Sequence, residues 1–221
     1  HRRSSAASDV YKRQVIIIHM KPKYWNKGKI YLSNKDKVLK KLIQTYRNEY
    51  LNLNSNYFHS LINSIIGQQI SVSAADSMKT KFFKLKRNIT PQTVSKLRTT
   101  DLRKCGLSRQ KILYIRNISK FFLQNKKFIK NINKSSEEEI YNNLIEIKGV
   151  GNWTIHMFLM FSYGSSNIFP TGDLGFLKAI SKLYKVQLPI SERKLKLLYK
   201  KWSPYSSQAT WYLWRSLDPI P

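Results

Sequence analysis

Cysteine is nearly absent from this sequence of 221 residues, which contains only Cys105. A disulfide needs two cysteines, and an iron–sulfur cluster or a cysteine-rich zinc site needs several. None of these can be built within the chain. Long apolar runs are also missing, since residues 15–18 form a run far shorter than the ~20 residues that span a bilayer. We therefore expect a soluble, intracellular protein with no membrane partner.

Acidic side chains are scarce as well, with 12 Asp and Glu against 40 Lys and Arg, for a formal charge of +28. Such a surplus indicates a polyanionic partner, which is nucleic acid or an anionic membrane. A compositional bias that also enriches Asn, Ile and Tyr is the alternative explanation. The chain nevertheless has 5 Trp and 13 Tyr, and its basic residues alternate with periodic apolar ones. This pattern favours a folded nucleic-acid-binding protein over a disordered basic tail.

Glycine and proline are also few, at 8 and 7 residues, and helical periodicity dominates from residue 21 onward. Apolar residues fall at helical spacing over 58–66 and again over 70–82, with Gly67, Gln68 and Gln69 between them. The sequence therefore predicts an all-α protein. With 42% apolar residues, it can bury one core or two small lobes that share a cleft.

Local signals place several helix ends. Thr90-Pro91 is a cap followed by proline at the first helical position, and Ser136 with Glu139 predicts a capping box. The helix after Ser136 is expected to run to about residue 147. The segment 148–151 then breaks it, and Asn152 is expected to cap the next helix, so that a helix, a tight hairpin and a second helix follow one another.

The first 19 residues differ from the rest, because they are largely polar and aperiodic. We expect residues 1–19 to be a non-native or disordered extension, with Met20 as the true start. Residues 20–221 are expected to form the folded domain.

The hairpin carries the first functional signal. Gly149 and Gly151 flank Val150 and allow a turn whose backbone N–H groups point outward, as a cradle for a phosphate oxygen. A Gly-x-Gly triplet alone is more often a plain turn. Here Trp153 and Thr154 follow it, and an acidic turn ending at Asp173 comes later.

Four segments in order resemble the helix-hairpin-helix DNA glycosylase superfamily, specifically its 3-methyladenine DNA glycosylase II branch. They are IIGQQISV at 65–72, CGLSRQK at 105–111, IKGVGNWT at 147–154 and FPTGDLG at 169–175. The resemblance covers roughly residues 24–217. It implies a two-lobed helical fold with the active-site cleft between the lobes. It further implies a monofunctional glycosylase of base excision repair that hydrolyses the N-glycosidic bond of alkylated purines such as 3-methyladenine and leaves an abasic site.

By the resemblance, Asp173 is the catalytic aspartate. Breaking the N-glycosidic bond builds positive charge on the sugar, which a fixed carboxylate stabilises, or the carboxylate orients water for attack. The alternative is that Asp173 only caps the helix that follows it, and the two roles are compatible.

Trp153 and Trp214 match the pocket tryptophans of the family. Electron-rich rings would stack on a cationic alkylated base. Core packing is the alternative, and it is favoured for Trp202 and Trp211. Because Trp153 stands where lyase relatives carry a Schiff-base lysine, we expect neither an imine nor strand nicking.

The resemblance also assigns DNA contacts. Gln69 matches the residue that fills the gap left by a flipped nucleotide, although some relatives use an apolar wedge. The hairpin residues Lys148, Gly149, Val150, Gly151 and Thr154 are expected to bind the strand beside the lesion, with Lys148 as a phosphate contact or a solvated charge. No cofactor is required, but a Na⁺ or K⁺ ion is expected on the carbonyl groups of Ile145, Ile147 and Val150.

The expected partner is double-stranded DNA containing alkylated bases, bound by a monomer, in the cytoplasm at the nucleoid of a prokaryote or in the nucleus of a eukaryote. Two alternatives stay open: a glycosylase for another damaged or mismatched base, and a non-enzymatic helix-hairpin-helix DNA-binding protein, which has no need of Asp173 or Trp214. An RNA-binding protein is a more distant third.

Overall fold

The computed structural model describes residues 20–217, so the extension expected over residues 1–19 lies outside the described residues. Among the described residues, every secondary-structure element longer than an isolated β-bridge is a helix. This confirms the all-α prediction. No helix in this part is long and apolar enough to cross a membrane. The elements are α2 (Trp25–Lys35), α3 (Lys37–Thr45), α4 (Tyr57–Gly67), α5 (Val72–Lys84), α6 (Pro91–Ser95), α7 (Thr99–Lys104), α8 (Arg109–Gln124), α9 (Lys126–Asn131), η1 (Ile132–Lys134), α10 (Glu137–Ile145), α11 (Asn152–Phe158), the π-helix η2 (Leu159–Tyr163), α12 (Leu174–Tyr184), α13 (Glu192–Trp202) and α14 (Ser206–Arg215).

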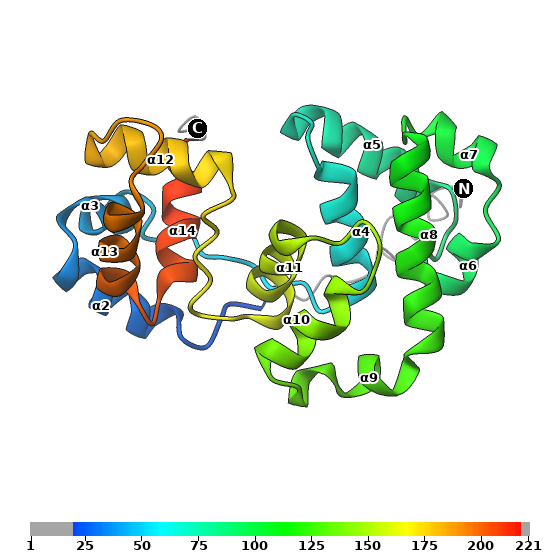
Figure 1. Ribbon diagram of the computed structural model, residues 1–221, viewed down its shortest axis with the longest axis horizontal. Helices are drawn as coiled ribbons and strands as arrows, with labels where there is room; N and C mark the ends of the chain where they lie inside the picture. The colour runs from blue at the N-terminus through cyan, green and yellow to red at the C-terminus, as the bar shows by residue number, and fades with distance from the viewer. Residues whose placement is uncertain (1–19, 218–221) are drawn as a thin grey trace, which may run out of the picture.

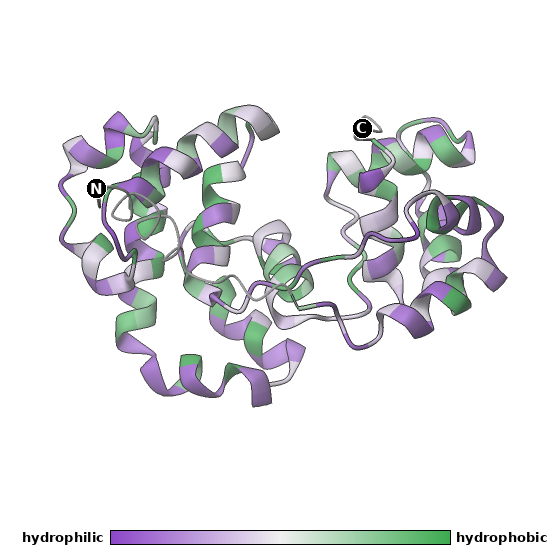
Figure 2. Cartoon of the chain, turned by 180° about the vertical axis from the view of Figure 1, so that it is seen from behind, coloured by the Kyte–Doolittle hydropathy of each residue, from purple (hydrophilic) through white to green (hydrophobic). Residues whose placement is uncertain are grey.

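The helices form two lobes (Figure 1). The two ends of the described residues build one lobe, in which α2 and α3 pack against α13 and α14, and α12 packs on α14. The middle of the chain, α4 to α11, builds the other lobe, where α4 contacts α5, α8 and α11. Residues 46–56 and 164–173 connect the lobes, and the first of these segments is largely polar (Figure 2). The predicted two-lobed arrangement is confirmed.

Two predicted helix starts are formed by local hydrogen bonds. Thr90 caps α6 in a capping box with Thr93, and Pro91 is the first helical residue. The hydroxyl of Ser136 accepts the backbone N–H of Glu139 at 3.1 Å, which starts α10. These bonds satisfy N–H groups that have no partner within the helix.

The expected cap at Asn152 was wrong. Gly151 is the N-cap of α11, and Asn152 is the first helical residue. Its side-chain oxygen accepts the Tyr141 hydroxyl at 2.6 Å instead. A tertiary partner on α10 therefore replaces the local bond, and it joins the two helices that flank the hairpin.

Asp36 joins the start of α3 to the end of α13 within one lobe. Its side chain is 2% exposed and caps α3 by accepting the N–H groups of Val38 and Leu39. The other carboxylate oxygen accepts the Trp202 indole N–H at 3.1 Å and lies 2.8 Å from the Lys201 ammonium. Burial opposes ionisation of Asp36, but the hydrogen bonds from Lys201, Trp202 and the backbone outweigh it, so the pKa of Asp36 lies below its usual value.

We expect Asp36→Ala to lower the free energy of unfolding by about 3 kcal/mol, because it removes a helix cap and leaves a buried indole N–H and an ammonium unpaired. Urea unfolding at pH 7 measures the loss. Asp76→Ala is the matched control, since Asp76 pairs with Lys79 only at the surface, and little change is expected.

The pH dependence follows from the lowered pKa of Asp36. Its contribution to stability is present above the unfolded-state pKa of about 3.9 and disappears as the pH falls through the folded-state pKa. The difference between wild type and Asp36→Ala should therefore narrow in acid. A difference that is equally large at pH 3 and pH 7 would contradict this account.

Candidate active site

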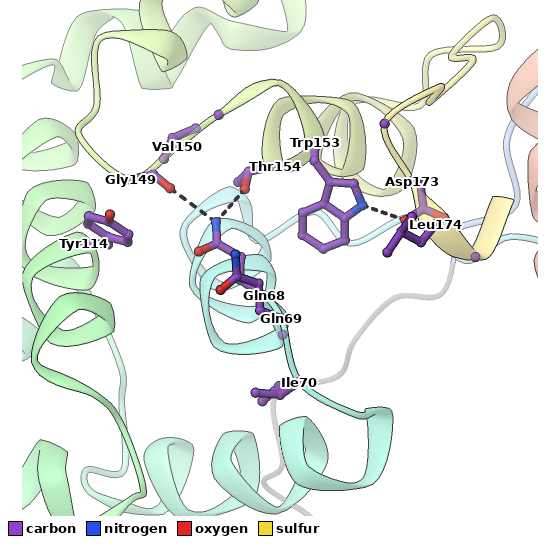
Figure 3. Close-up of a pocket in the computed structure, with 14 residues that line it drawn as sticks. Gln68, Gln69, Ile70, Tyr114, Gly149, Val150, Trp153, Thr154, Asp173 and Leu174 are labelled. Carbon is purple, nitrogen blue, oxygen red and sulfur yellow. Dashed lines mark hydrogen bonds between the residues drawn. The ribbon is translucent and has the colours of Figure 1, made fainter. Parts of the chain in front are cut away.

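A cleft of about 760 Å³ lies between the lobes. The start of α12 forms its wall on one side. The junction of α4 and α5, the hairpin with the first turn of α11, and Tyr114 of α8 form the wall on the other side (Figure 3). The lining residues are Gly67, Gln68, Gln69, Ile70, Tyr114, Gly149, Val150, Gly151, Trp153, Thr154, Gly172, Asp173, Leu174 and Gly175. Most of the residues predicted for the site therefore meet in one cavity.

Asp173 lies at the start of α12 with both carboxylate oxygens bound. One oxygen accepts the backbone N–H of Phe176 at 2.6 Å and the Trp214 indole N–H at 2.9 Å. The other accepts the Trp153 indole N–H at 2.7 Å. Asp173 is thus a helix cap and a cleft residue at the same time. Donors from α11, α12 and α14 fix the orientation of its carboxylate.

Gly175 provides the space for this arrangement. A Cβ atom at position 175 would lie 3.2 Å from the bound carboxylate oxygen of Asp173 and 3.5 Å from the Trp214 ring. The first distance is tighter than an ordinary van der Waals contact, so a side chain would press on the carboxylate, whereas the second is an ordinary contact. The sequence places Gly175 in a family motif but does not indicate this role, because Trp214 is distant in the chain.

The two predicted pocket tryptophans lie differently. Trp153 lines the cavity, whereas Trp214 contacts Asp173 but is not one of the lining residues, and it stacks on Phe161 with 6.0 Å between ring centroids. Of the two tryptophans expected in the core, Trp202 is fully buried. Trp211 is only partly buried and packs edge-on against Trp25 at 5.2 Å.

The hairpin needs only one of its two glycines for its shape. Gly149 has φ 103°, and a Cβ atom there would overlap the Tyr114 ring at 2.1 Å, so both conformation and space require glycine. Gly151 has extended backbone and open space around it. The N–H of Val150 donates to the Ile147 carbonyl at 2.8 Å, so it is not one of the outward-pointing groups that the sequence predicted.

Two other residues of this region that were predicted to bind DNA differ in exposure. Lys148 has an exposed side chain, and its backbone carbonyl accepts the Asn117 amide at 3.1 Å. Thr154 is 1% exposed, and its hydroxyl accepts the Gln68 amide at 3.1 Å. The Thr154 side chain therefore supports the site from within.

The α4–α5 junction presents its two glutamines differently. Gln68 also donates to the Gly149 carbonyl at 3.2 Å, so it is bound to the hairpin. Gln69 is exposed, lines the cavity and has φ 57°, in the left-handed region that non-glycine residues rarely adopt. The structure thus separates a bound glutamine from an exposed one, and the exposed one is the residue that the resemblance matched to the gap filler.

Sequence reasoning missed the contribution of α8. Three of its side chains, spaced three residues apart, touch the site: Lys111 donates to the Ile66 carbonyl at 2.7 Å, Tyr114 packs on Gly149, and Asn117 binds the hairpin. Burial lowers the pKa of the Lys111 ammonium. The signal that was available is the regular spacing of long polar side chains opposite the apolar face of this helix.

The two histidines of the described residues, His59 and His156, are not grouped as metal ligands. His59 contacts the Ile89 carbonyl at 2.7 Å, and burial lowers the pKa of His156. Among the described residues, no group of three His, Cys, Asp or Glu side chains could hold a metal ion.

Comparisons with known proteins agree with the two-lobed helical fold. Bacillus subtilis YfjP is 29% identical over 174 residues, which cover 75% of this chain and 61% of YfjP. DNA-3-methyladenine glycosylase 1 of Schizosaccharomyces pombe is 29% identical over 199 residues, or 86% of each chain. The structure of the S. pombe 3-methyladenine DNA glycosylase Mag1 in complex with abasic DNA superposes with a TM-score of 0.76 at 25% identity, covering 86% of this chain and 96% of that one. Residues 62–204 match the model of the HhH-GPD superfamily base excision DNA repair proteins. The chain therefore belongs to the HhH-GPD superfamily of base excision DNA repair proteins.

Proposed function

We propose that this protein is a monofunctional DNA glycosylase that hydrolyses the N-glycosidic bond of 3-methyladenine and related alkylated purines in double-stranded DNA. The observation that carries the proposal is the Asp173 carboxylate, held in the interlobe cleft by three N–H donors. The relatives named as 3-methyladenine DNA glycosylases, and the neighbour bound to abasic DNA, support the same substrate and product.

Asp173 would act on the sugar of the flipped nucleotide. As the base departs, positive charge develops at the anomeric carbon, and a carboxylate that is already oriented stabilises this charge without reorganising. An alkylated purine is itself cationic and leaves readily, so no strong general acid is needed. The face of Trp153 provides a π-surface for such a base.

The absence of lyase activity is part of the proposal. A lyase forms an imine through a free amine in the cleft. Position 153 carries an indole, and no lysine is among the cleft-lining residues in the described part of the chain. Lys111 is near this site, but its ammonium is bound to the Ile66 carbonyl.

A monomer with a formal charge of +28 would bind the phosphate backbone with strongly salt-dependent affinity. We include in the proposal a Na⁺ or K⁺ ion on the carbonyl groups of Ile145, Ile147 and Val150. The Ile147 carbonyl already accepts the N–H of Val150, which leaves it one further lone pair for a cation.

Asp173→Asn should reduce excision by about 100-fold or more, because it removes the charge while keeping the shape of the side chain. The assay is release of free 3-methyladenine from methylated duplex DNA, together with binding to an abasic-site duplex. Asp101→Asn is the matched control, since Asp101 pairs with Arg98 at the surface of the other lobe, and its excision rate should equal that of wild type.

Equal release by wild type and Asp173→Asn would refute the assigned role of this carboxylate. If neither protein releases any base and both still bind DNA, the proposed substrate is wrong, and a non-enzymatic DNA-binding protein or another lesion class takes its place.

Strand breaks should appear only after alkali treatment of the reacted DNA, because hydrolysis without an imine leaves an intact abasic strand. Denaturing electrophoresis with and without alkali measures this. A covalent enzyme–DNA adduct trapped by borohydride would contradict the monofunctional mechanism.

A further inference from the structure

We infer that Gln68 is a positioning residue that couples the grip of the hairpin on DNA to the insertion of Gln69 at the lesion. This inference rests on the proposed function. It assigns to the amide of Gln68 a role that is separate from the chemistry at Asp173.

The backbone at Gln69 needs an external constraint. Its φ of 57° lies in the left-handed region, which is unfavourable for a residue other than glycine. The Gln69 side chain is exposed in the cleft and has no hydrogen bond within residues 20–217. The side-chain amide of Gln69 therefore does not hold this backbone conformation, and neighbouring groups must do so.

Gln68 supplies one such constraint. Its amide nitrogen donates to the Gly149 carbonyl at 3.2 Å and to the Thr154 hydroxyl at 3.1 Å (Figure 3). A primary amide has two N–H donors, so both bonds can form at once. The residue directly before Gln69 is thereby bound to both sides of the hairpin turn.

Lys111 supplies the second constraint, from α8. Its ammonium binds the carbonyl of Ile66 near the end of α4, at 2.7 Å. The same helix holds the hairpin, since Tyr114 packs on Gly149 and Asn117 binds the Lys148 carbonyl. The junction and the hairpin therefore share one rigid support, and Gln68 is the direct link between them.

This link has a consequence for flipping. When a DNA strand fixes the hairpin, the Gly149 carbonyl and the Thr154 hydroxyl are fixed too, and they hold Gln68 and the strained backbone of Gln69 in place. Opening a base pair costs a few kcal/mol, and less when the base is already unpaired. Gln68 should therefore matter for a matched duplex and matter little for a lesion in a bubble of mismatched pairs.

The experiment compares Gln68→Ala and Gln68→Glu with wild type. Glutamate keeps the size of glutamine but has no N–H to donate to the Gly149 carbonyl. Gln44→Ala on α3 is the matched control, because Gln44 is an exposed glutamine of the other lobe. Fluorescence of 2-aminopurine, placed as the base-paired target nucleotide of a matched duplex, measures unstacking. Filter binding to undamaged duplex measures the grip, and thermal unfolding checks the fold.

Both Gln68 variants should lower the unstacked fraction in matched duplex by about tenfold, which is the size of one lost hydrogen bond of 1.4 kcal/mol. Their affinity for undamaged duplex and their melting temperatures should stay close to those of wild type. Single-turnover excision should fall similarly for a matched lesion and remain near wild type for the bubble. In a Gln69→Ala background, Gln68→Ala should add little, because the two residues act in series.

Equal losses on matched and bubble substrates, or additive losses in the double variant, would overturn the coupling and leave Gln68 a merely structural residue. Unchanged fluorescence in both Gln68 variants would do the same. The fluorescence readout needs no excision. A wild-type protein that unstacks DNA but releases no base therefore refutes the proposed substrate alone, and the Gln68 result still decides the inference.

Discussion

The orientation of one carboxylate depends on the packing of both lobes. Asp173 caps α12, and Trp214 lies on α14 in the same lobe. Trp153 lies on α11, in the lobe built from the middle of the chain. The Trp153 indole N–H reaches Asp173 only when the two lobes are correctly placed. Preorganised groups of this kind are what a reaction with a developing positive charge requires.

Two of the scarce acidic residues join segments that are far apart in the sequence. Asp36 joins α3 to the end of α13. Glu49 forms a bidentate ion pair with Arg215, and the shorter of its two contacts is 2.6 Å. The Arg215 guanidinium also lies over the Tyr46 ring. Arg215 directly follows Trp214, whose indole N–H donates to Asp173. With these carboxylates occupied, the basic surplus of the chain is left for a polyanion.

The two segments that we propose to contact DNA rest on a single helix. The hairpin and the α4–α5 junction are both bound by side chains of α8, and Gln68 connects them directly. Sites supported by rigid helices hold their geometry better than sites on free loops. The left-handed backbone of Gln69 is consistent with such support, since strained residues persist where surrounding contacts hold them.

The sequence by itself determined the helical class and the starts of α6 and α10, and its resemblance to the family pointed to Asp173. Thr90 and Ser136 cap their helices through bonds to residues three positions away, so neighbouring residue types suffice to predict them. Asn152 shows the limit, because a tertiary partner, Tyr141, took the oxygen that a local cap would have used.

Only the tertiary structure decided which groups surround the site. The space at Gly175, the overlap that Tyr114 imposes on position 149 and the bonds of Gln68 all join residues from separate helices. Such contacts depend on where whole elements pack, which residue spacing along one helix does not specify. The residue types of the candidate site were therefore readable from the sequence, whereas their positioning followed from the packing of the two lobes.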